Sequence, residues 1–438
     1  MAPLWLYRVL RRRNPLPGPR QSLGFLPKTL RSDGRPTIWF HSCSVGETLS
    51  VGPLAHELHE RFPDARLVFS TITDTGQAIA RQRFGKYGEG NSFYFPFDVP
   101  PIVRRVFDEI RPTMLVIVDV EIWPNVVHEA NRRGIPVAMC NGRIPAGDFR
   151  RYRLVRRFLG RVLGGYSLLM MKSQEDAERI LVLGAPPEKV VVTGNVKCDR
   201  DVVERELRKV QTGALERSLG LEDDAAPLIV AGCTHPPEEA IVLDVFRRLR
   251  QEPNLGNVRL LLAPRHPERF DEVAELARKK GFTVRRRTDQ AAPDGKAEVL
   301  LLDSIGELST AYRFATVAFV GGTLVPHGGQ SVLEPACYAR PIVIGPSMES
   351  FPQIVDDFRA GQALVQIPAT SARRDLQVEQ LVEALGGLLK SREARESLGR
   401  RAAAVLDASR GAAALTAERL ASLYVATRRA ATASPTRE

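Results

Sequence analysis

The chain has 438 residues, of which 44% are hydrophobic and 26% charged, and its net charge is +11. This length favours two domains, and this composition excludes a disordered or fibrous chain. The five cysteines are scattered without a CxxC pair. The sequence therefore indicates neither a zinc site nor a disulfide framework, and we expect reduced cysteines in a cytoplasmic protein.

The positive charge is concentrated in the first half. Residues 1–40 hold eight basic residues against Asp33 alone, and residues 143–161 hold seven arginines against Asp148 alone. Such patches imply an anionic partner, either a phospholipid surface, a phosphorylated substrate or nucleic acid. Residues 1–10 are apolar but too short to span a membrane. The alternatives for this terminus are an interfacial membrane contact and a frayed basic end.

Short apolar runs alternate with helical patterns along the chain, which predicts an α/β fold with parallel sheets and crossover helices. The predicted strands of the first half are 37–40, 67–70, 114–118, 136–140, 167–171 and 190–193. Those of the second half are 228–231, 259–263, 299–302, 316–320, 341–344 and 363–366.

The domain boundary is predicted near the start of residues 199–224, which are charged, strand-free and mostly helical in pattern. We expect a basic segment at 1–20, a first Rossmann-like domain at 21–205 and a second at 206–427 that includes the terminal helix. Residues 428–438 are predicted to be a disordered tail.

A glycine-rich loop joins the predicted strands 316–320 and 341–344. The pairs Gly321-Gly322 and Gly328-Gly329 let a ligand approach main-chain N–H groups, and the helix start that follows suits a phosphate. The carboxylate of Glu334 can accept hydrogen bonds from ribose hydroxyls. A doubly wound sheet binds nucleotides at such a position, beyond the carboxyl ends of its strands.

The pattern Ser-x-x-Glu follows a predicted strand three times, at Ser44–Glu47, Ser304–Glu307 and Ser331–Glu334. This is the spacing of a capping box, so one interpretation is that each glutamate only begins a helix. The other is that all three line one cleft, because strand carboxyl ends gather at one edge of a sheet. Glu47 could then act as a general base on a substrate hydroxyl. The neighbouring His41 is more often a structural residue.

Two further strand ends carry charged side chains. Asp119 and Glu121 follow strand 114–118 beside Trp123, which suggests contacts to a sugar; the alternative is a surface loop with Trp123 in the core. Arg265 follows strand 259–263, where a guanidinium can hold a phosphate with two hydrogen bonds.

The segments SVGE, EIWPN, AGCTH, APRHPERF, DSIGEL and GGTLVPHGG…LEPA occur in this order and together resemble the 3-deoxy-D-manno-octulosonic acid (Kdo) transferases of lipopolysaccharide synthesis. The resemblance runs from about Gln21 to beyond Phe351. It implies a GT-B fold, with two Rossmann-like domains facing across a cleft. It also implies inverting transfer of Kdo from CMP-Kdo to a phosphorylated lipid A precursor of the lipid IVA type. The location implied is the cytoplasmic face of the bacterial inner membrane, with peripheral attachment to its anionic surface.

The resemblance also implies site residues. Glu47 matches the family's general base, and Glu121 lies in the acidic segment that we assign to catalysis with it. The expected CMP-Kdo contacts are Pro264, Arg265, Gly306, Glu307, Leu308, Ser331, Val332, Leu333 and Glu334. No cofactor is implied, and no metal, since CMP carries one phosphate and the chain has no Asp-x-Asp cluster.

Two departures from the family pattern keep alternatives open. Gln330-Ser331-Val332 stands where the family usually reads His-Asn-Pro, and Asp119 stands where Glu is common. The altered loop favours a related transferase that uses another CMP-activated acidic sugar or another acceptor. A non-catalytic nucleotide-sugar-binding paralogue is the third hypothesis, against which Glu47 and Arg265 argue. Nucleic acid is not expected as a partner, because no aromatic stacking motif accompanies the charge.

Overall fold

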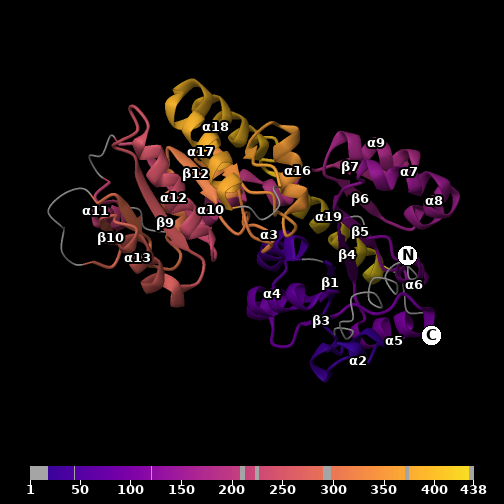
Figure 1. Cartoon of the computed structure of the whole chain (residues 1–438). Helices are drawn as coiled ribbons and strands as arrows, with labels where there is room; N and C mark the ends of the chain where they lie inside the picture. Colours follow the sequence, from indigo (N-terminus) through magenta and orange to yellow (C-terminus); the bar gives the residue numbers. More distant parts are fainter. Residues whose placement is uncertain are drawn as a thin grey trace. The chain divides into compact units, whose positions relative to one another are not determined.

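A computed structural model describes residues 18–43, 45–119, 121–207, 213–221, 226–289, 297–369 and 374–433. The chain divides into two compact units, the first made of Met1–Asp199 with Gly411–Glu438 and the second of Arg200–Arg410 (Figure 1). Most of the expected basic segment 1–20 lies outside the described residues. Among those described, no helix combines the length and apolar character needed to cross a bilayer.

The first unit contains a seven-stranded parallel sheet in the order β3-β2-β1-β4-β5-β6-β7. The strands are β1 (Thr37–His41), β2 (Arg66–Thr71), β3 (Ser92–Tyr94), β4 (Met114–Val118), β5 (Val137–Gly142), β6 (Leu168–Met171) and β7 (Val190–Val192). Six of them correspond to predicted strands, and β3 does not. The chain adds strands on one side of β1 up to β3 and then on the other side from β4 onward. A doubly wound sheet has its binding crevice at this switch point between β1 and β4.

Helices connect these strands. They are α2 (Pro19–Ser22), α3 (Val45–Arg61), α4 (Asp74–Phe84), α5 (Pro100–Ile110), α6 (Pro124–Arg132), α7 (Ala146–Leu154), α8 (Arg156–Gly164) and α9 (Gln174–Val182). The terminal helix α19 (Ala412–Ala433) also belongs to this unit, whereas we expected it in the second domain. It packs on α3, and the ring of its buried Tyr424 lies 4.7 Å from that of Phe62. It also extends through residues 428–433 of the expected disordered tail, while 434–438 lie outside the described residues.

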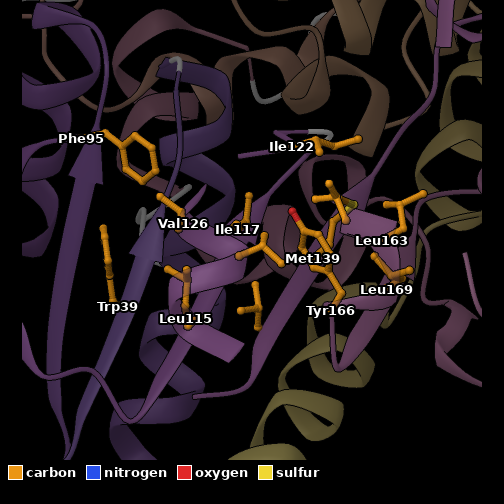
Figure 2. Close-up of a cluster of buried hydrophobic side chains, with 14 of the residues drawn as sticks. Trp39, Phe95, Leu115, Ile117, Ile122, Val126, Met139, Leu163, Tyr166 and Leu169 are labelled. Carbon is orange, nitrogen blue, oxygen red and sulfur yellow. The ribbon is translucent and has the colours of Figure 1, made fainter. Parts of the chain in front are cut away.

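One face of this sheet carries a continuous apolar core. Figure 2 shows Trp39, Leu115, Met139 and Leu169, which come from four neighbouring strands and are completely buried. Because side chains alternate along a strand, His41 points to the same face as Trp39, two residues further on. The core thus ends in a buried imidazole at the carboxyl end of β1.

The second unit repeats the architecture, with the strand order β10-β11-β9-β8-β12-β13-β14, all parallel. The strands are β8 (Leu228–Thr234), β9 (Arg259–Pro264), β10 (Val284–Arg286), β11 (Val299–Leu301), β12 (Val317–Val320), β13 (Ile342–Ile344) and β14 (Val365–Gln366). Only the short β10 was not predicted. The α/β fold class with two Rossmann-like sheets is therefore confirmed.

The helices of the second unit are α10 (Arg200–Leu207), α11 (Gly213–Leu219), α12 (Glu238–Gln251), α13 (Phe270–Lys279), α14 (Leu308–Ala311), α15 (Leu333–Cys337), α16 (Pro352–Ala360), α17 (Arg374–Lys390) and α18 (Arg392–Asp407). The second unit begins at Arg200, whereas the sequence places the boundary at 205/206.

Candidate active site

Glu47 lies in the first turn of α3, directly beyond β1, and is 9% exposed. Its Oε2 accepts a hydrogen bond from the backbone N–H of Cys43 at 2.6 Å. The carboxylate thus reaches back to the residue before the expected capping residue Ser44, one position before the contact that a capping box makes, and the helix dipole favours a carboxylate there. Glu47 therefore begins a helix and also stands at the carboxyl edge of the sheet, while the interpretation that the three glutamates line one cleft stays a prediction. Ser44 lies outside the described residues.

His41 is held on two sides. Its Nδ1 lies 3.0 Å from Oγ and 3.3 Å from the carbonyl oxygen of Ser70, and its ring stacks on Phe95 at 3.6 Å between centroids. A carbonyl can only accept, so the ring proton sits on Nδ1 and leaves Nε2 as the acceptor. Burial lowers the pKa of His41 to about 3, and the imidazole is neutral at ordinary pH. Its Nε2 lies 3.6 Å from the sulfur of Cys43.

The two acidic residues beyond β4 have different surroundings. Asp119 accepts hydrogen bonds from Asn141 Nδ2 at 2.8 Å and from Lys197 Nζ at 2.7 Å, and both side chains of the ion pair are only 7% exposed. These contacts give Asp119 a structural role in the loop, where its backbone adopts a left-handed φ of 60°. The carboxylate of Glu121 is instead partly exposed and hydrogen-bonds the Cys43 thiol.

The structure brings Glu47 and Glu121 together around Cys43. Burial, followed by the nearby charges of these two carboxylates, holds the pKa of the Cys43 thiol well above its usual value. Trp123 packs against the core beside them, with its ring 5.0 Å from that of Phe95. Trp123 thus packs against the core, as one alternative expected. This geometry is also compatible with a site at the same strand end.

In the second unit, Pro264 ends β9 and Arg265 follows with an exposed side chain. Its backbone N–H donates to the carbonyl of Thr234 at 3.0 Å, which joins the carboxyl ends of β8 and β9. The charges of Arg265 and Glu334 both act on the pKa of Cys233, which burial raises to about 11. Arg265 and Glu334 therefore both lie near Cys233, as the sequence predicts for residues at the strand ends of one sheet.

Three histidines that sequence reasoning did not assign gather near Arg265. The ring of His235 lies 4.4 Å from that of His327 and 5.2 Å from that of His266. Burial, then His327 and His266, lower the pKa of His235 to about 4. Its Nε2 is buried without a hydrogen-bond partner in the part of the chain that the structure describes. This nitrogen is available to a polar ligand that reaches it.

The first part of the glycine loop is held by Glu238, a residue that sequence reasoning missed. Oε1 accepts from the N–H groups of Thr323 and Leu324 at 2.9 and 2.8 Å. Oε2 accepts from those of Gly322 and His235 at 2.6 and 2.9 Å. These loop amides are therefore bonded to a carboxylate and are not open to a phosphate. No capping-box signal in the sequence indicates this role, because Glu238 is the first residue of α12 and follows Pro237.

The expected contacts in the second part of the loop lie at the start of α15. The backbone N–H of Leu333 donates to Ser331 Oγ at 3.3 Å, and Ser331 also hydrogen-bonds Glu334. Burial raises the pKa of the Glu334 carboxyl. The side chain of Val332 is completely buried, so only its backbone could meet a ligand.

The remaining expected contacts lie beyond β11. Glu307 forms a two-pronged ion pair with Arg287, with both N–O distances 3.0 Å, and accepts a hydrogen bond from the hydroxyl of Ser304. Its carboxylate is therefore already engaged. Gly306 has φ of +89° and no atom within 4 Å of the position a Cβ would take, so the backbone is open there. Leu308 begins α14 and is partly buried.

Residues 18–200 match the family described as 3-deoxy-D-manno-octulosonic-acid transferase (kdotransferase). The chain is 34% identical over 374 residues to a 3-deoxy-D-manno-octulosonic acid transferase of Haemophilus influenzae, covering 85% of this chain and 84% of that protein. It is 30% identical over 376 residues to one from Bordetella pertussis, covering 84% and 85%.

Among solved structures, UDP-GlcNAc 2-epimerase from Neisseria meningitidis bound to UDP-GlcNAc has a similar fold, with a TM-score of 0.54. The match covers 88% of this chain and 100% of that one. The sequence identity is 11%, so this likeness concerns the fold alone.

Proposed function

We propose that this chain transfers Kdo from CMP-Kdo to a lipid A precursor of the lipid IVA type. The chain belongs to the 3-deoxy-D-manno-octulosonic acid transferase family and is therefore a glycosyltransferase. The observation that carries this proposal is the placement of Glu47. Its carboxylate stands at the crevice edge of the first sheet, oriented by the Cys43 amide and accompanied by Glu121.

Glu47 acts as the general base in this proposal. It takes the proton of the acceptor hydroxyl while that oxygen attacks the anomeric carbon of Kdo, and CMP leaves from the opposite face, so the configuration inverts. The Cys43 N–H fixes one carboxylate oxygen and thereby the direction of the group. Glu121 contributes a second carboxylate at the same strand edge, where it can hydrogen-bond hydroxyls of the sugar.

Donor binding is assigned to the second unit. Arg265 is exposed beside the histidine cluster and supplies a cation for the phosphate of CMP. Glu334 and Ser331 offer oxygen acceptors for ribose, and Pro264, Val332 and Leu333 contribute the adjoining backbone. Gly306, Glu307 and Leu308 complete the set, with the open backbone at Gly306 as their point of approach.

The acceptor and the membrane are assigned to the basic surface of the first unit. Leu154, Val155 and Phe158 of the α7–α8 region are 86%, 49% and 54% exposed, and they lie among arginines in the sequence. Apolar side chains between cations suit the interface of an anionic bilayer and the phosphates of the acceptor. This supports peripheral attachment to an anionic membrane surface, which we assign to the cytoplasmic face of the inner membrane.

The test is to incubate the purified protein with freshly generated CMP-Kdo and tetraacylated lipid A precursor, and to weigh the lipid by mass spectrometry. Glu47→Gln removes the base, and Glu60→Gln, an exposed residue of the same helix, is the matched control. We expect a mass gain of one or more Kdo units with the wild type and Glu60→Gln only. Full transfer by Glu47→Gln would contradict the role of the base.

A second candidate is transfer to another acceptor or from another CMP-activated acidic sugar, which the Gln330-Ser331-Val332 departure favours. No mass gain with CMP-Kdo binding intact would indicate another acceptor. No gain and no CMP-Kdo binding would indicate another donor.

A further inference from the structure

Three side chains at the carboxyl ends of β1 and β4 form a ligand set that the proposed transfer reaction does not use as such. The imidazole of His41, the thiol of Cys43 and the carboxylate of Glu121 each offer one ligand atom, and these atoms lie within 4.8 Å of one another. Nitrogen, sulfur and carboxylate oxygen are the donor types found in zinc sites. The cysteine spacing gives no sign of this set, because strand ends far apart in the sequence assemble it.

The distances suit one ion. Zinc binds histidine nitrogen at about 2.0–2.1 Å and cysteine sulfur at about 2.3 Å, so two such ligands at a tetrahedral angle stand about 3.5 Å apart. Nε2 of His41 and Sγ of Cys43 are 3.6 Å apart. The pair therefore already has the separation of ligands on a common ion.

The outer contacts of His41 are those of a metal-binding histidine. Its other nitrogen, Nδ1, is held by Ser70, and Phe95 fixes the plane of the ring. Such second contacts fix the tautomer and direct the free nitrogen at the ion. Cys43 and Glu121 are partly exposed, so an ion can enter from solvent and keep water as its fourth ligand.

We propose that His41, Cys43 and Glu121 bind a thiophilic divalent cation of the Zn²⁺ type, and that the bound cation inhibits the enzyme. The Cys43 thiol gives its proton to the buffer, and its sulfur binds the metal as the thiolate. Hard cations such as Mg²⁺ do not compete, since they prefer oxygen ligands throughout.

The inhibitory part rests on the proposed function. The cation engages Glu121, and it lies beside the residue whose backbone N–H holds Glu47. A bound ion takes the carboxylate of Glu121 away from the hydroxyls of the sugar, and it occupies the strand edge at which the acceptor must approach Glu47.

Binding is tested without any substrate, by adding Co²⁺ to the full-length reduced protein and recording its absorption spectrum. We expect a thiolate-to-cobalt charge-transfer band that Zn²⁺ removes, and the release of one proton in calorimetry with two buffers. Cys43→Ser should abolish the band, while Cys233→Ser, which removes another partly exposed cysteine, should keep it. Absence of the band in the wild type, or its persistence in Cys43→Ser, would overturn the proposal.

Two milder variants guard against loss of folding. Ser70→Ala removes an outer contact of His41 and should weaken Zn²⁺ binding about 10- to 100-fold. Glu121→Gln removes a ligand charge and should weaken it further. Unchanged affinity in both would also overturn the site.

Activity is measured separately, with and without Zn²⁺ and a chelator. Zn²⁺ should lower the turnover of the wild type and the chelator restore it. If the wild type is active and shows the band, but its turnover is the same with and without Zn²⁺, the inhibitory part of the proposal is overturned. A protein with the band but no transferase activity would instead contradict the proposed function and leave the metal site standing.

Discussion

Glu238 offers the sharpest test of how the second unit is organised. Each of its carboxylate oxygens accepts two backbone N–H groups, and the residue is completely buried. The substitution Glu238→Gln keeps one oxygen with its two bonds and turns an NH₂ group toward the other two donors. The volume of the side chain hardly changes, so the effect isolates the hydrogen bonds.

The expected cost follows from those two bonds. A hydrogen bond to a charged group contributes about 1.5–3 kcal/mol, so two lost bonds cost about 3–6 kcal/mol of the free energy that closes the loop. Because each 1.4 kcal/mol is a factor of ten, amide protection in the loop should fall about 10²- to 10⁴-fold. The whole-domain stability of a typical protein is only about 5–15 kcal/mol, so this loss is large.

The assay is hydrogen exchange of the peptide that contains Gly322, Thr323 and Leu324, read by mass spectrometry. Tryptophan fluorescence does not serve, because all three tryptophans lie within the first 123 residues. Glu393→Gln, an exposed position in the first turn of α18, is the control and should stay within about 0.5 kcal/mol of the wild type. A loss of protection below tenfold in Glu238→Gln would refute the reasoning.

The other predictions concern different parts of the chain. Asp119→Asn should lower the free energy of unfolding by about 3–5 kcal/mol, because it removes the carboxylate charge that compensates the buried ammonium group of Lys197. Adding Lys197→Met should recover part of this loss in urea unfolding. Gly345→Ala should destabilise the second unit by about 1–3 kcal/mol, since its Cβ would stand 2.3 Å from a backbone carbonyl oxygen. Gly387→Ala, at an exposed position in the last turn of α17, should instead stabilise it by about 0.5–1 kcal/mol in thermal unfolding. Two neighbouring arginines lower the pKa of Glu129 from 4.5 to about 2, so its stabilising contribution is complete above pH 4.5 and is lost as the pH falls toward 2. Denaturation midpoints at pH 7 and pH 3 should therefore differ less for Glu129→Gln than for the wild type.

The strands were predictable because each is a short apolar run bounded by polar or turn residues. The strand MLVIV at Met114–Val118 is buried throughout, as a parallel sheet covered on both faces requires. The two strands that sequence reasoning missed have three residues each and are not distinctly apolar, as in Val284–Arg286. The placement of α19 was also not predictable, since an apolar helical pattern does not say which sheet the helix covers.

The position of the candidate residues at strand ends was predictable for the same topological reason, but their partners were not. The pairing of Asp119 with Lys197 joins residues far apart in sequence, and it turns an expected substrate contact into a structural ion pair. Glu307 similarly proves to be engaged by Arg287. Local sequence patterns predict that a charged side chain lies at the carboxyl edge of a sheet. Which oppositely charged residue pairs with it depends on the tertiary structure.

Glu47 and Glu238 have in common that a carboxylate accepts backbone N–H groups at the start of a helix. They differ in exposure. Glu238 is 0% exposed with both oxygens bonded to the backbone, so it can only hold its loop in place. Glu47 is 9% exposed, and its bond to Cys43 uses Oε2. The proposed base at Glu47 therefore requires that a buried carboxylate at a helix start keep an edge open to the acceptor hydroxyl, and its 9% exposure is what the chain offers for this.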